Sequence, residues 1–136
     1  MYLTENPSWI EQYNYAYARA KDIPSEVFNT LNQKLDHLQR NEPLVSIIIS
    51  AWNEEVSLLR CIGSLANQKT QIPIEIIVVN NNSQDDTQFT IDQLHVTGFF
   101  QEIQGCGPAR QLGQENAKGT YILLADADCL YPEHWV

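Results

Sequence analysis

Four short apolar runs, separated by segments with helical patterns, limit most strongly how this chain can fold. The first run, residues 44–50, is rich in isoleucine, which is typical of a strand covered on both faces. The other runs lie at residues 74–79, 99–103 and 121–125. Strands and helices that alternate in this way predict an α/β fold, with a mostly parallel sheet and helices on both of its faces.

Each gap between two runs carries a helix signal. Asn53 is a candidate N-cap, and the two glutamates that follow it would stabilise the first turn through the helix dipole. A second helix is expected from residue 85 or 86 to about residue 98. A third is expected over residues 107–119, because Pro108 suits a first turn and glycine follows the last residue.

Residues 1–43 show a different pattern, with several tyrosines and no run of β-branched residues. A helix is predicted from Ser8 to about Ala20, before the Ile23-Pro24 step that ends it. A second helix is predicted over residues 24–41, where apolar residues repeat at helical spacing. We therefore expect a helical N-terminal extension, residues 1–43, before an α/β unit, residues 44–136.

The charge balance narrows the range of partners. The 136 residues include 8 Lys and Arg against 17 Asp and Glu, a formal net charge of −9. No basic cluster is present, which argues against a nucleic-acid partner. A ligand that carries phosphate would need a metal ion to offset this negative charge.

The lack of a signal-peptide pattern and the spacing of the cysteines indicate an intracellular compartment. Residues 1–20 lack the basic start and apolar core of a signal peptide, and the longest apolar run is too short to cross a bilayer. The three cysteines, Cys61, Cys106 and Cys129, lie far apart, which argues against a disulfide framework or a zinc site. We therefore expect a cytoplasmic protein.

The segments that follow the four runs are the place to search for a site, since ligands of open α/β sheets bind beyond the carboxyl ends of the strands. Asp126-Ala127-Asp128 follows the fourth run. Carboxylates two residues apart point the same way if the strand geometry continues, and their hard oxygens suit Mg²⁺ or Mn²⁺. The alternative is an ordinary turn, in which aspartate is common.

Three further features at the strand ends have both a structural and a functional interpretation. The Asn80–Asp86 segment is either a strand-to-helix turn or a set of amides that read the edge of a base. Trp52 either covers the core or stacks on a planar ring. Arg110, near the start of a helix, is either a surface residue or a ligand for an anion. Taken singly, these residues leave the alternatives open.

Taken together and in order, five segments resemble family 2 glycosyltransferases of the GT-A fold. These segments are Val45–Glu55, Ser64–Gln68, Glu75–Ser83, Gly107–Gly113 and Ala117–Asp128. The resemblance covers about residues 44–136. It implies a Rossmann-like GT-A three-layer sandwich, which would form the N-terminal, nucleotide-sugar-binding half of such an enzyme.

The resemblance implies transfer of a sugar from a nucleotide diphosphate sugar to a glycan or lipid-linked acceptor of the cell envelope or of a polysaccharide. A UDP-sugar is favoured over a GDP- or dTDP-sugar as the donor. Mn²⁺ or Mg²⁺, held by Asp126 and Asp128, would stabilise charge on the leaving diphosphate. The residues implied to bind the donor are Ser50, Ala51, Trp52, Asn53, Glu54, Asn80, Asn81, Asn82, Arg110 and Asp126.

The sequence also departs from the family pattern. The family usually has acids where this chain has Asn80 and Asn81, so amides would make the base contact. The acceptor-binding half, and the carboxylate base of inverting members, are expected beyond residue 136. We therefore expect the chain to be a truncated, donor-binding half that is inactive in transfer by itself.

Other hypotheses stay open beside this one. The chain could be a non-catalytic protein that binds nucleotide sugars, or an interaction module whose residues 1–43 dock a partner. Association with the inner face of a membrane, as a peripheral protein, is a variant of the second. A homodimer through the exposed edge of a truncated sheet is a further hypothesis.

Overall fold

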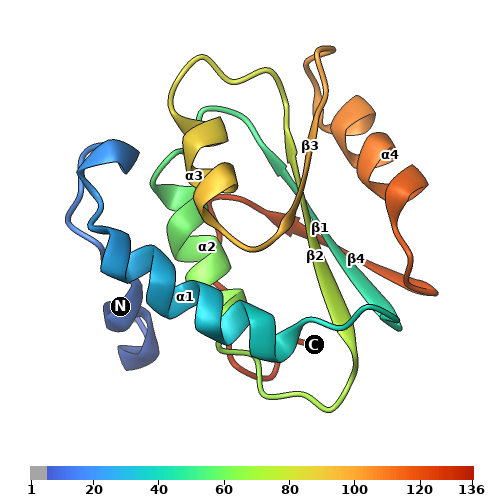
Figure 1. Ribbon diagram of the computed structural model, residues 1–136, viewed down its shortest axis with the longest axis horizontal. Coiled ribbons are helices and arrows are strands. Elements are labelled where there is room, and N and C mark those ends of the chain that lie inside the picture. Colours follow the sequence, from blue (N-terminus) through green and yellow to red (C-terminus); the bar gives the residue numbers. More distant parts are fainter. Residues whose placement is uncertain (1–5) are drawn as a thin grey trace, which may run out of the picture.

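A computed structural model describes residues 6–136, and Figure 1 shows a sheet between two layers of helices. Four parallel strands lie in the order β3-β2-β1-β4. The strands are β1 (Val45–Ala51), β2 (Ile74–Asn80), β3 (Thr97–Phe100) and β4 (Tyr121–Asp126). The helices are α1 (Ser25–Leu38), α2 (Ser57–Ala66), α3 (Thr87–Gln93) and α4 (Cys106–Asn116). The predicted α/β three-layer sandwich is confirmed.

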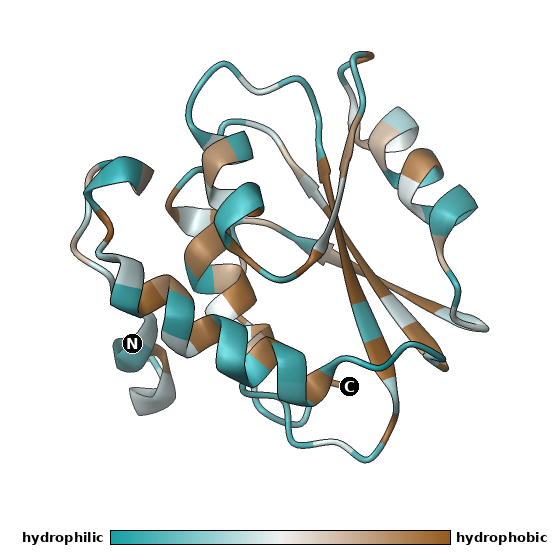
Figure 2. Ribbon diagram, viewed as in Figure 1, coloured by the Kyte–Doolittle hydropathy of each residue, from teal (hydrophilic) through white to brown (hydrophobic). Residues whose placement is uncertain are grey.

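The two central strands, β1 and β2, form the core of the molecule. The helices α1, α2 and α3 cover one face of the sheet, and α4 covers the other (Figure 1). Hydrophobic residues run along these strands (Figure 2), and nearly every residue of both is buried. Because both faces are covered, these strands need no polar alternation, which is why their sequences are continuous apolar runs.

A buried polar pair interrupts this core where the β1 and β2 runs carry Ser46 and Glu75. The Ser46 hydroxyl donates to Glu75 Oε1 over 2.6 Å, and the Lys118 N–H donates to the same oxygen over 2.7 Å. The Gly119 N–H donates to Ser46 Oγ over 2.9 Å. A Cβ on Gly119 would lie 2.7 Å from Ser46 N, so glycine is required where the chain enters β4.

The helix predicted from Ser8 to about Ala20 is wrong. The structure has two short 3-10 helices, η1 (Ser8–Tyr13) and η2 (Ala20–Asp22), with an irregular segment between them. The reason is a period of two: Tyr13, Tyr15 and Tyr17 turn toward the core while the residues between them are exposed. Such alternation requires extended backbone. Residues 1–5 of the predicted extension lie outside the described residues.

Several other boundaries differ from those predicted: α1 ends at Leu38 rather than at residue 41, α4 ends at Asn116 rather than at residue 119, and β3 ends at Phe100 rather than at residue 103. Asn53 does not cap a helix, because its φ of 51° places it in a left-handed turn, and α2 begins only at Ser57. The second predicted helix, α3, ends at Gln93 rather than near residue 98. The third strand begins at Thr97, two residues early, because Thr97 pairs with Ile77 of β2. Within residues 6–136, no helix has the length and apolar character needed to span a bilayer.

Candidate functional site

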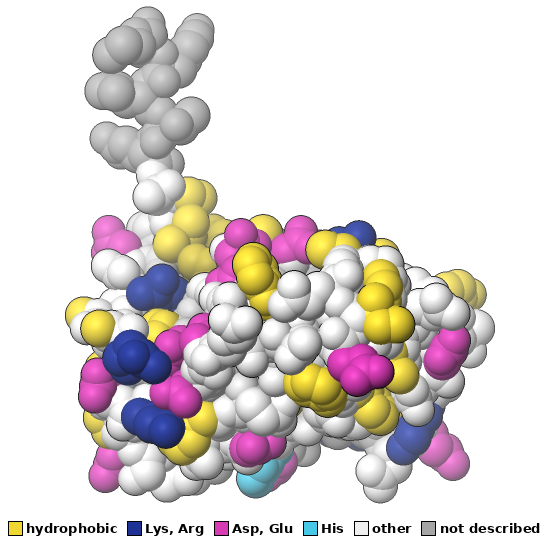
Figure 3. All heavy atoms as spheres, turned by 90° about the horizontal axis from the view of Figure 1, so that it is seen from above, with side chains coloured by type: hydrophobic (Ala, Val, Ile, Leu, Met, Phe, Trp, Pro, Cys, Tyr) yellow, Lys and Arg dark blue, Asp and Glu magenta, His cyan; other side chains and the backbone are white. Residues whose placement is uncertain are grey.

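A cavity of about 450 Å³ opens where the carboxyl ends of β1, β2 and β4 meet. Figure 3 looks onto this end of the molecule, where acidic and hydrophobic side chains are scattered over a mostly uncharged surface and Lys and Arg lie toward the margins. The cavity is lined by Ser50, Trp52, Glu54, Asn81, Gln104, Gly105, Cys106, Asp126, Ala127 and Asp128. Four strand-end segments therefore converge on one hollow, as parallel topology requires.

Asp126 and Asp128 both line the cavity, with the buried Ala127 between them. Asp126 is the last residue of β4 and pairs in register with Ser50 of β1. Its carboxylate lies 3.3 Å from Arg110 Nη2, which α4 provides. The two exposed carboxylates thus face the same space, and a cation stands beside one of them.

The backbone of Asp126 is fixed by a residue that follows the acidic motif. The Asp126 N–H donates to the hydroxyl of Tyr131 over 2.8 Å. The N–H of Tyr131 donates in turn to Ser64 Oγ on α2. Burial raises the pKa of Tyr131 to about 12, so the phenol is neutral at ordinary pH and can accept this bond. The acidic motif therefore rests on a rigid support.

The amides of Asn80 and Asn81 are buried and hold loops in place. Asn80 donates to Gln88 Oε1 and accepts the N–H of Ser83. Asn81 donates to the carbonyl oxygens of Gln101 and Ile103, and accepts the N–H of Gly105. These bonds use most of the hydrogen-bonding capacity of the Asn81 amide and about half of that of Asn80. The structure thus gives both residues a structural role; Asn81 also lines the cavity.

Two left-handed asparagines shape the loops after β1 and β2. Asn53 and Asn82 have φ values of 51° and 57°. The Asn53 N–H donates to Ser83 Oγ, and Asn53 Oδ1 accepts the N–H of Gln84. Asn82 donates to the carbonyl of Glu102 over 3.2 Å. These contacts join the two loops, so both are positioned together.

Trp52 is 54% exposed, on the loop that these bonds hold. An indole that covered the core would be buried, so the exposed ring favours the stacking interpretation. Five of the predicted donor residues line the cavity, namely Ser50, Trp52, Glu54, Asn81 and Asp126, and so does Asp128 of the predicted metal pair. The others, Ala51, Asn53, Asn80, Asn82 and Arg110, lie behind or beside its wall.

This geometry agrees with the comparison of the sequence with protein families. The family model described as Glycosyl transferase family 2 matches residues 46–136. The chain belongs to this family. The family match therefore includes every strand residue except Val45, together with the whole cavity, and it leaves residues 1–45 outside.

Relatives and solved structures agree with the family assignment. The chain is 32% identical over 102 residues to glycosyltransferase AglE of Haloferax volcanii, covering 69% of the chain and 33% of that protein. It is 41% identical over 92 residues to an uncharacterized glycosyltransferase of Rickettsia typhi, covering 65% and 28%. The chain thus spans about a third or less of these curated relatives.

Two solved structures share the fold. S. aureus TarS 1–349 in complex with UDP superposes with a TM-score of 0.58 at 25% identity, over 66% of this chain and 29% of that one. The mannosyltransferase PcManGT of Pyrobaculum calidifontis, in complex with GDP-Man and Mn²⁺, has a TM-score of 0.59 at 18% identity, over 90% and 40%. At that identity, the second likeness shows the fold alone.

Four cavity residues of this family 2 chain were absent from the predicted donor set: Gln104, Gly105, Cys106 and Ala127. Three of them form the turn into α4, where Gly105 has a φ of 135° that glycine tolerates best. The Gly-x-Gly-Pro spacing marked this turn in the sequence, but its side chains are too ordinary to suggest a ligand. The start of α4 directs the positive end of its dipole toward the cavity wall.

The carboxylate pair fits a divalent cation only if other groups complete its coordination. Within residues 6–136, no three His, Cys, Asp or Glu side chains come together as a metal site. Two hard carboxylates at a cavity mouth are the usual protein share for Mg²⁺, which takes its remaining ligands from phosphate and water. Asp126 and Asp128 therefore fit a cation that binds together with a diphosphate.

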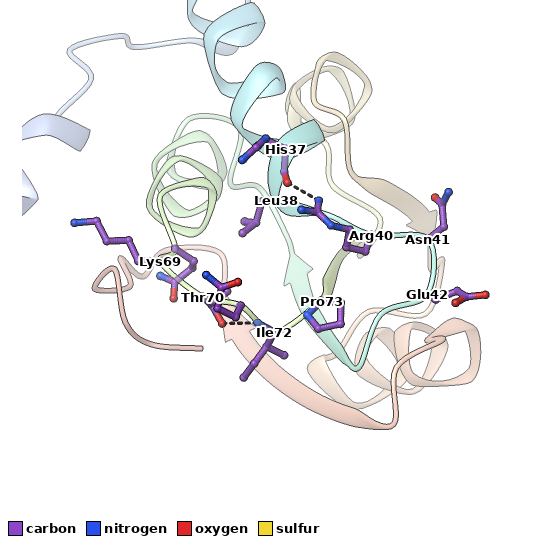
Figure 4. Close-up of a pocket in the computed structure, with 11 residues that line it drawn as sticks. His37, Leu38, Arg40, Asn41, Glu42, Lys69, Thr70, Ile72 and Pro73 are labelled. Atoms are coloured by element: carbon purple, nitrogen blue, oxygen red, sulfur yellow. Dashed lines mark hydrogen bonds between the residues drawn. The ribbon is translucent and has the colours of Figure 1, made fainter.

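The largest cavity, about 1050 Å³, lies at the opposite end of the sheet, against the amino ends of β1 and β2. Figure 4 shows the charged ends of Lys69 and Glu42 extending away from this hollow rather than into it. Arg40 is occupied there by the carbonyl oxygens of His37 and Gln39. Size alone therefore does not identify the site, and the convergent polar groups lie at the carboxyl end.

Proposed function

We propose that the cavity at the carboxyl ends of the strands binds a nucleotide diphosphate sugar, as the donor-binding part of a glycosyltransferase. The observation that carries this proposal is that one cavity joins an exposed indole, Trp52, to two carboxylates, Asp126 and Asp128. A nucleotide sugar needs both features: a flat surface for its base, and carboxylates that hold a divalent cation against its diphosphate. Ser50 and Glu54 line the wall between them and are proposed ribose or phosphate contacts.

Trp52 is the proposed platform for the base. Stacking on an aromatic ring contributes about 1–3 kcal/mol per base and tolerates any base. The buried Asn80 and Asn81 place the loop, and Asn82, whose side chain is exposed, is the amide best placed to add base selectivity. A uridine nucleotide is the proposed base class, which the UDP complex of the 25% identical TarS supports.

The diphosphate is proposed to lie between the acidic pair and the start of α4. A chain with a net charge of −9 repels a diphosphate, so positive charge must be supplied locally. Arg110 and the dipole of α4 supply part of it. When bound at Asp126 and Asp128, Mn²⁺ or Mg²⁺ would supply Lewis-acid stabilisation of the leaving diphosphate.

Sugar transfer requires an acceptor and a base beyond the groups described so far. We propose a glycan or lipid-linked acceptor, and a catalytic base that comes from outside residues 6–136. In this proposal the chain's own residues bind and orient the donor: Trp52 fixes the base, and Asp126 and Arg110 fix the diphosphate end.

Calorimetric titration of the chain with UDP, GDP and dTDP, each with Mn²⁺ and with a chelator, tests this proposal. We expect UDP to bind most tightly, with a clear gain from the metal. Trp52→Ala should weaken binding by about 5- to 100-fold, the equivalent of one lost stack, while Trp52→Phe retains most of it. Binding of all three nucleotides that is indifferent to Trp52 and to the metal would overturn the proposal.

A further inference from the structure

A second cavity, about 410 Å³ in volume, adjoins the proposed donor site. It lies between the N-terminal segment with η1, the start of α2 and the loop after β4. Its lining residues are Asn6, Ile10, Glu11, Tyr13, Asn14, Ser57, Arg60, Asp128, Cys129 and Leu130. Asp128 lines both cavities, so the two cavities adjoin at this residue.

Half of this second cavity comes from residues outside the family match. Five of its lining residues precede residue 46, where the match begins. The N-terminal segment is held over the fold by several contacts: Tyr13 Oη accepts from Asn67, and the Ala20 N–H donates to Glu55. Half of the cavity wall therefore lies outside the part of the chain that the family model matches.

Arg60 provides the strongest polar group of the cavity. Its Nη2 donates to the carbonyl of Tyr15 over 2.8 Å, which fixes the guanidinium beneath the N-terminal segment. Its Nε is the one buried side-chain nitrogen or oxygen within residues 6–136 that has no hydrogen-bond partner. A buried donor without a partner is unfavourable, and only an occupant whose acceptor atom reaches Nε would satisfy it; the other N–H groups of the guanidinium can donate to a ligand in the cavity.

The charges of the cavity exclude an anion as its preferred occupant. One cation, Arg60, faces two carboxylates, Glu11 and Asp128. The amide of Asn14 and the hydroxyl of Ser57 add neutral donors and acceptors, and the wall also has an apolar part. A neutral molecule with many hydroxyl groups and an apolar ring face satisfies this mixture, and a saccharide has both.

We propose that this cavity binds a neutral sugar unit of the acceptor, on the far side of Asp128 from the donor. The inference rests on the proposed function, because it takes the first cavity to hold the donor. Transfer requires the acceptor hydroxyl to approach the sugar carbon that leaves the diphosphate. A saccharide site that shares a wall residue with the diphosphate site meets this requirement, since the two substrates then lie on either side of one carboxylate.

The test is a ¹H–¹⁵N NMR titration of the chain, first with UDP and Mg²⁺ and then with methyl glycosides of glucose, galactose, mannose and N-acetylglucosamine. We expect at least one glycoside to shift the amides of residues 10–14 and 57–60 in a saturable way. Arg60→Gln should lower the affinity for that glycoside by about tenfold or more, because a charge-assisted hydrogen-bond donor is lost. The affinity for UDP should not change.

Glu11→Gln and Arg40→Gln complete the design. Glu11 is exposed, so Glu11→Gln should keep the fold. This variant should lower the affinity for the glycoside even if Arg60→Gln is unstable. Arg40, at the opposite end of the sheet, is the matched arginine control and should change nothing. The inference fails if UDP binds but no glycoside moves these amides, or if inorganic phosphate moves them instead. If the unmodified chain does not bind UDP, the proposed function itself is refuted.

Discussion

Arg110 Nη2 lies 3.3 Å from Asp126 Oδ1, so the cation beside the proposed donor site is paired with a carboxylate proposed to hold the metal. The two roles of Asp126 compete, because an arginine and a divalent cation attract the same oxygen. Removing the guanidinium should therefore have opposite effects on the two ligands. We expect Arg110→Gln to weaken metal-free UDP binding by about 3- to 10-fold and to strengthen Mn²⁺ binding by a similar factor.

Lys118→Gln is the control for that experiment. Lys118 is exposed, lies before β4 at the opposite end of the strand, and its substitution removes the same unit of charge. Calorimetry at two salt concentrations separates a local contact from the general field, since salt screens the general field. If Arg110→Gln and Lys118→Gln behave alike, Arg110 has no specific place in the site.

Asp128→Asn should remove the gain in UDP affinity that Mn²⁺ provides. A neutral amide keeps the shape of the carboxylate but supplies neither its charge nor its second hard oxygen, so a cation with few protein ligands is lost. We expect the affinities with Mn²⁺ and with chelator to become equal to within about twofold, against a difference of about tenfold or more in the unmodified chain. Asp22→Asn, an exposed change in η2, should leave the metal effect intact.

The parts of the fold that sequence reasoning predicted are those that burial controls. β1 and β2 begin and end within one residue of their apolar runs, because a strand covered on both faces must be apolar throughout. β4 also ends within one residue of its apolar run, although most of its residues are exposed. The predicted helix over residues 8–20 is wrong because three tyrosines at alternate positions, a period of two, outweigh the helix signals. The predicted position of the short β3 was wrong by two to three residues, since most of its residues are exposed and its sequence is only partly apolar.

The candidate site divides in the same way. Trp52 and the two aspartates could be predicted, because a chemically distinctive side chain after a strand end falls at the open edge of the sheet. The buried position of Asn81 could not, since it depends on the carbonyl oxygens of a loop about 20 residues away. The cavity wall formed by residues 104–106 could not be predicted either, because these residues contribute the shape of their backbone and not a distinctive side chain.

Asn81→Asp should destabilise the fold. The Asn81 amide donates to two carbonyl oxygens, 3.3 and 2.8 Å away, and a carboxylate has no proton to donate to either. We expect a loss of about 1–3 kcal/mol in the free energy of unfolding, measured with urea. Asn82→Asp is the control, because Asn82 is exposed and makes one donor contact of 3.2 Å. Its cost should stay below about 1 kcal/mol, and equal costs would contradict the structural role of Asn81.

The stability of the chain should depend on Tyr131 at alkaline pH. Burial raises the pKa of Tyr131 to about 12 from its ordinary value of 10.0. The folded state thus keeps a proton that the unfolded state releases, so this stabilisation is complete below about pH 10 and declines as the pH rises toward 12. Urea unfolding across this range should show a steeper decline for the unmodified chain than for Tyr131→Phe. Parallel declines would show that Tyr131 does not titrate differently in the two states.

Gly113 and Gly107 lie on the same helix, α4, but only Gly113 is packed against the sheet. A Cβ on Gly113 would lie 2.5 Å from Ile48 Cγ2, whereas one on Gly107 would meet nothing within 4 Å apart from its chain neighbours. Ile48 is buried in β1 and its Cγ2 is bound directly to Cβ, so α4 must move away instead. We expect Gly113→Ala to cost about 1–3 kcal/mol in the free energy of unfolding.

The same shift of α4 should reach the proposed donor site, because the residues that open the helix, Gly105 and Cys106, line the cavity. Gly113→Ala should therefore weaken UDP binding as well, although the substituted residue does not line the cavity. Gly107→Ala should keep UDP affinity and change the free energy of unfolding by less than about 1 kcal/mol, because the better helix preference of alanine is offset by the contact of its Cβ with the ring of Pro108. If Gly113→Ala destabilises the fold but binds UDP normally, the position of α4 is not what shapes the site.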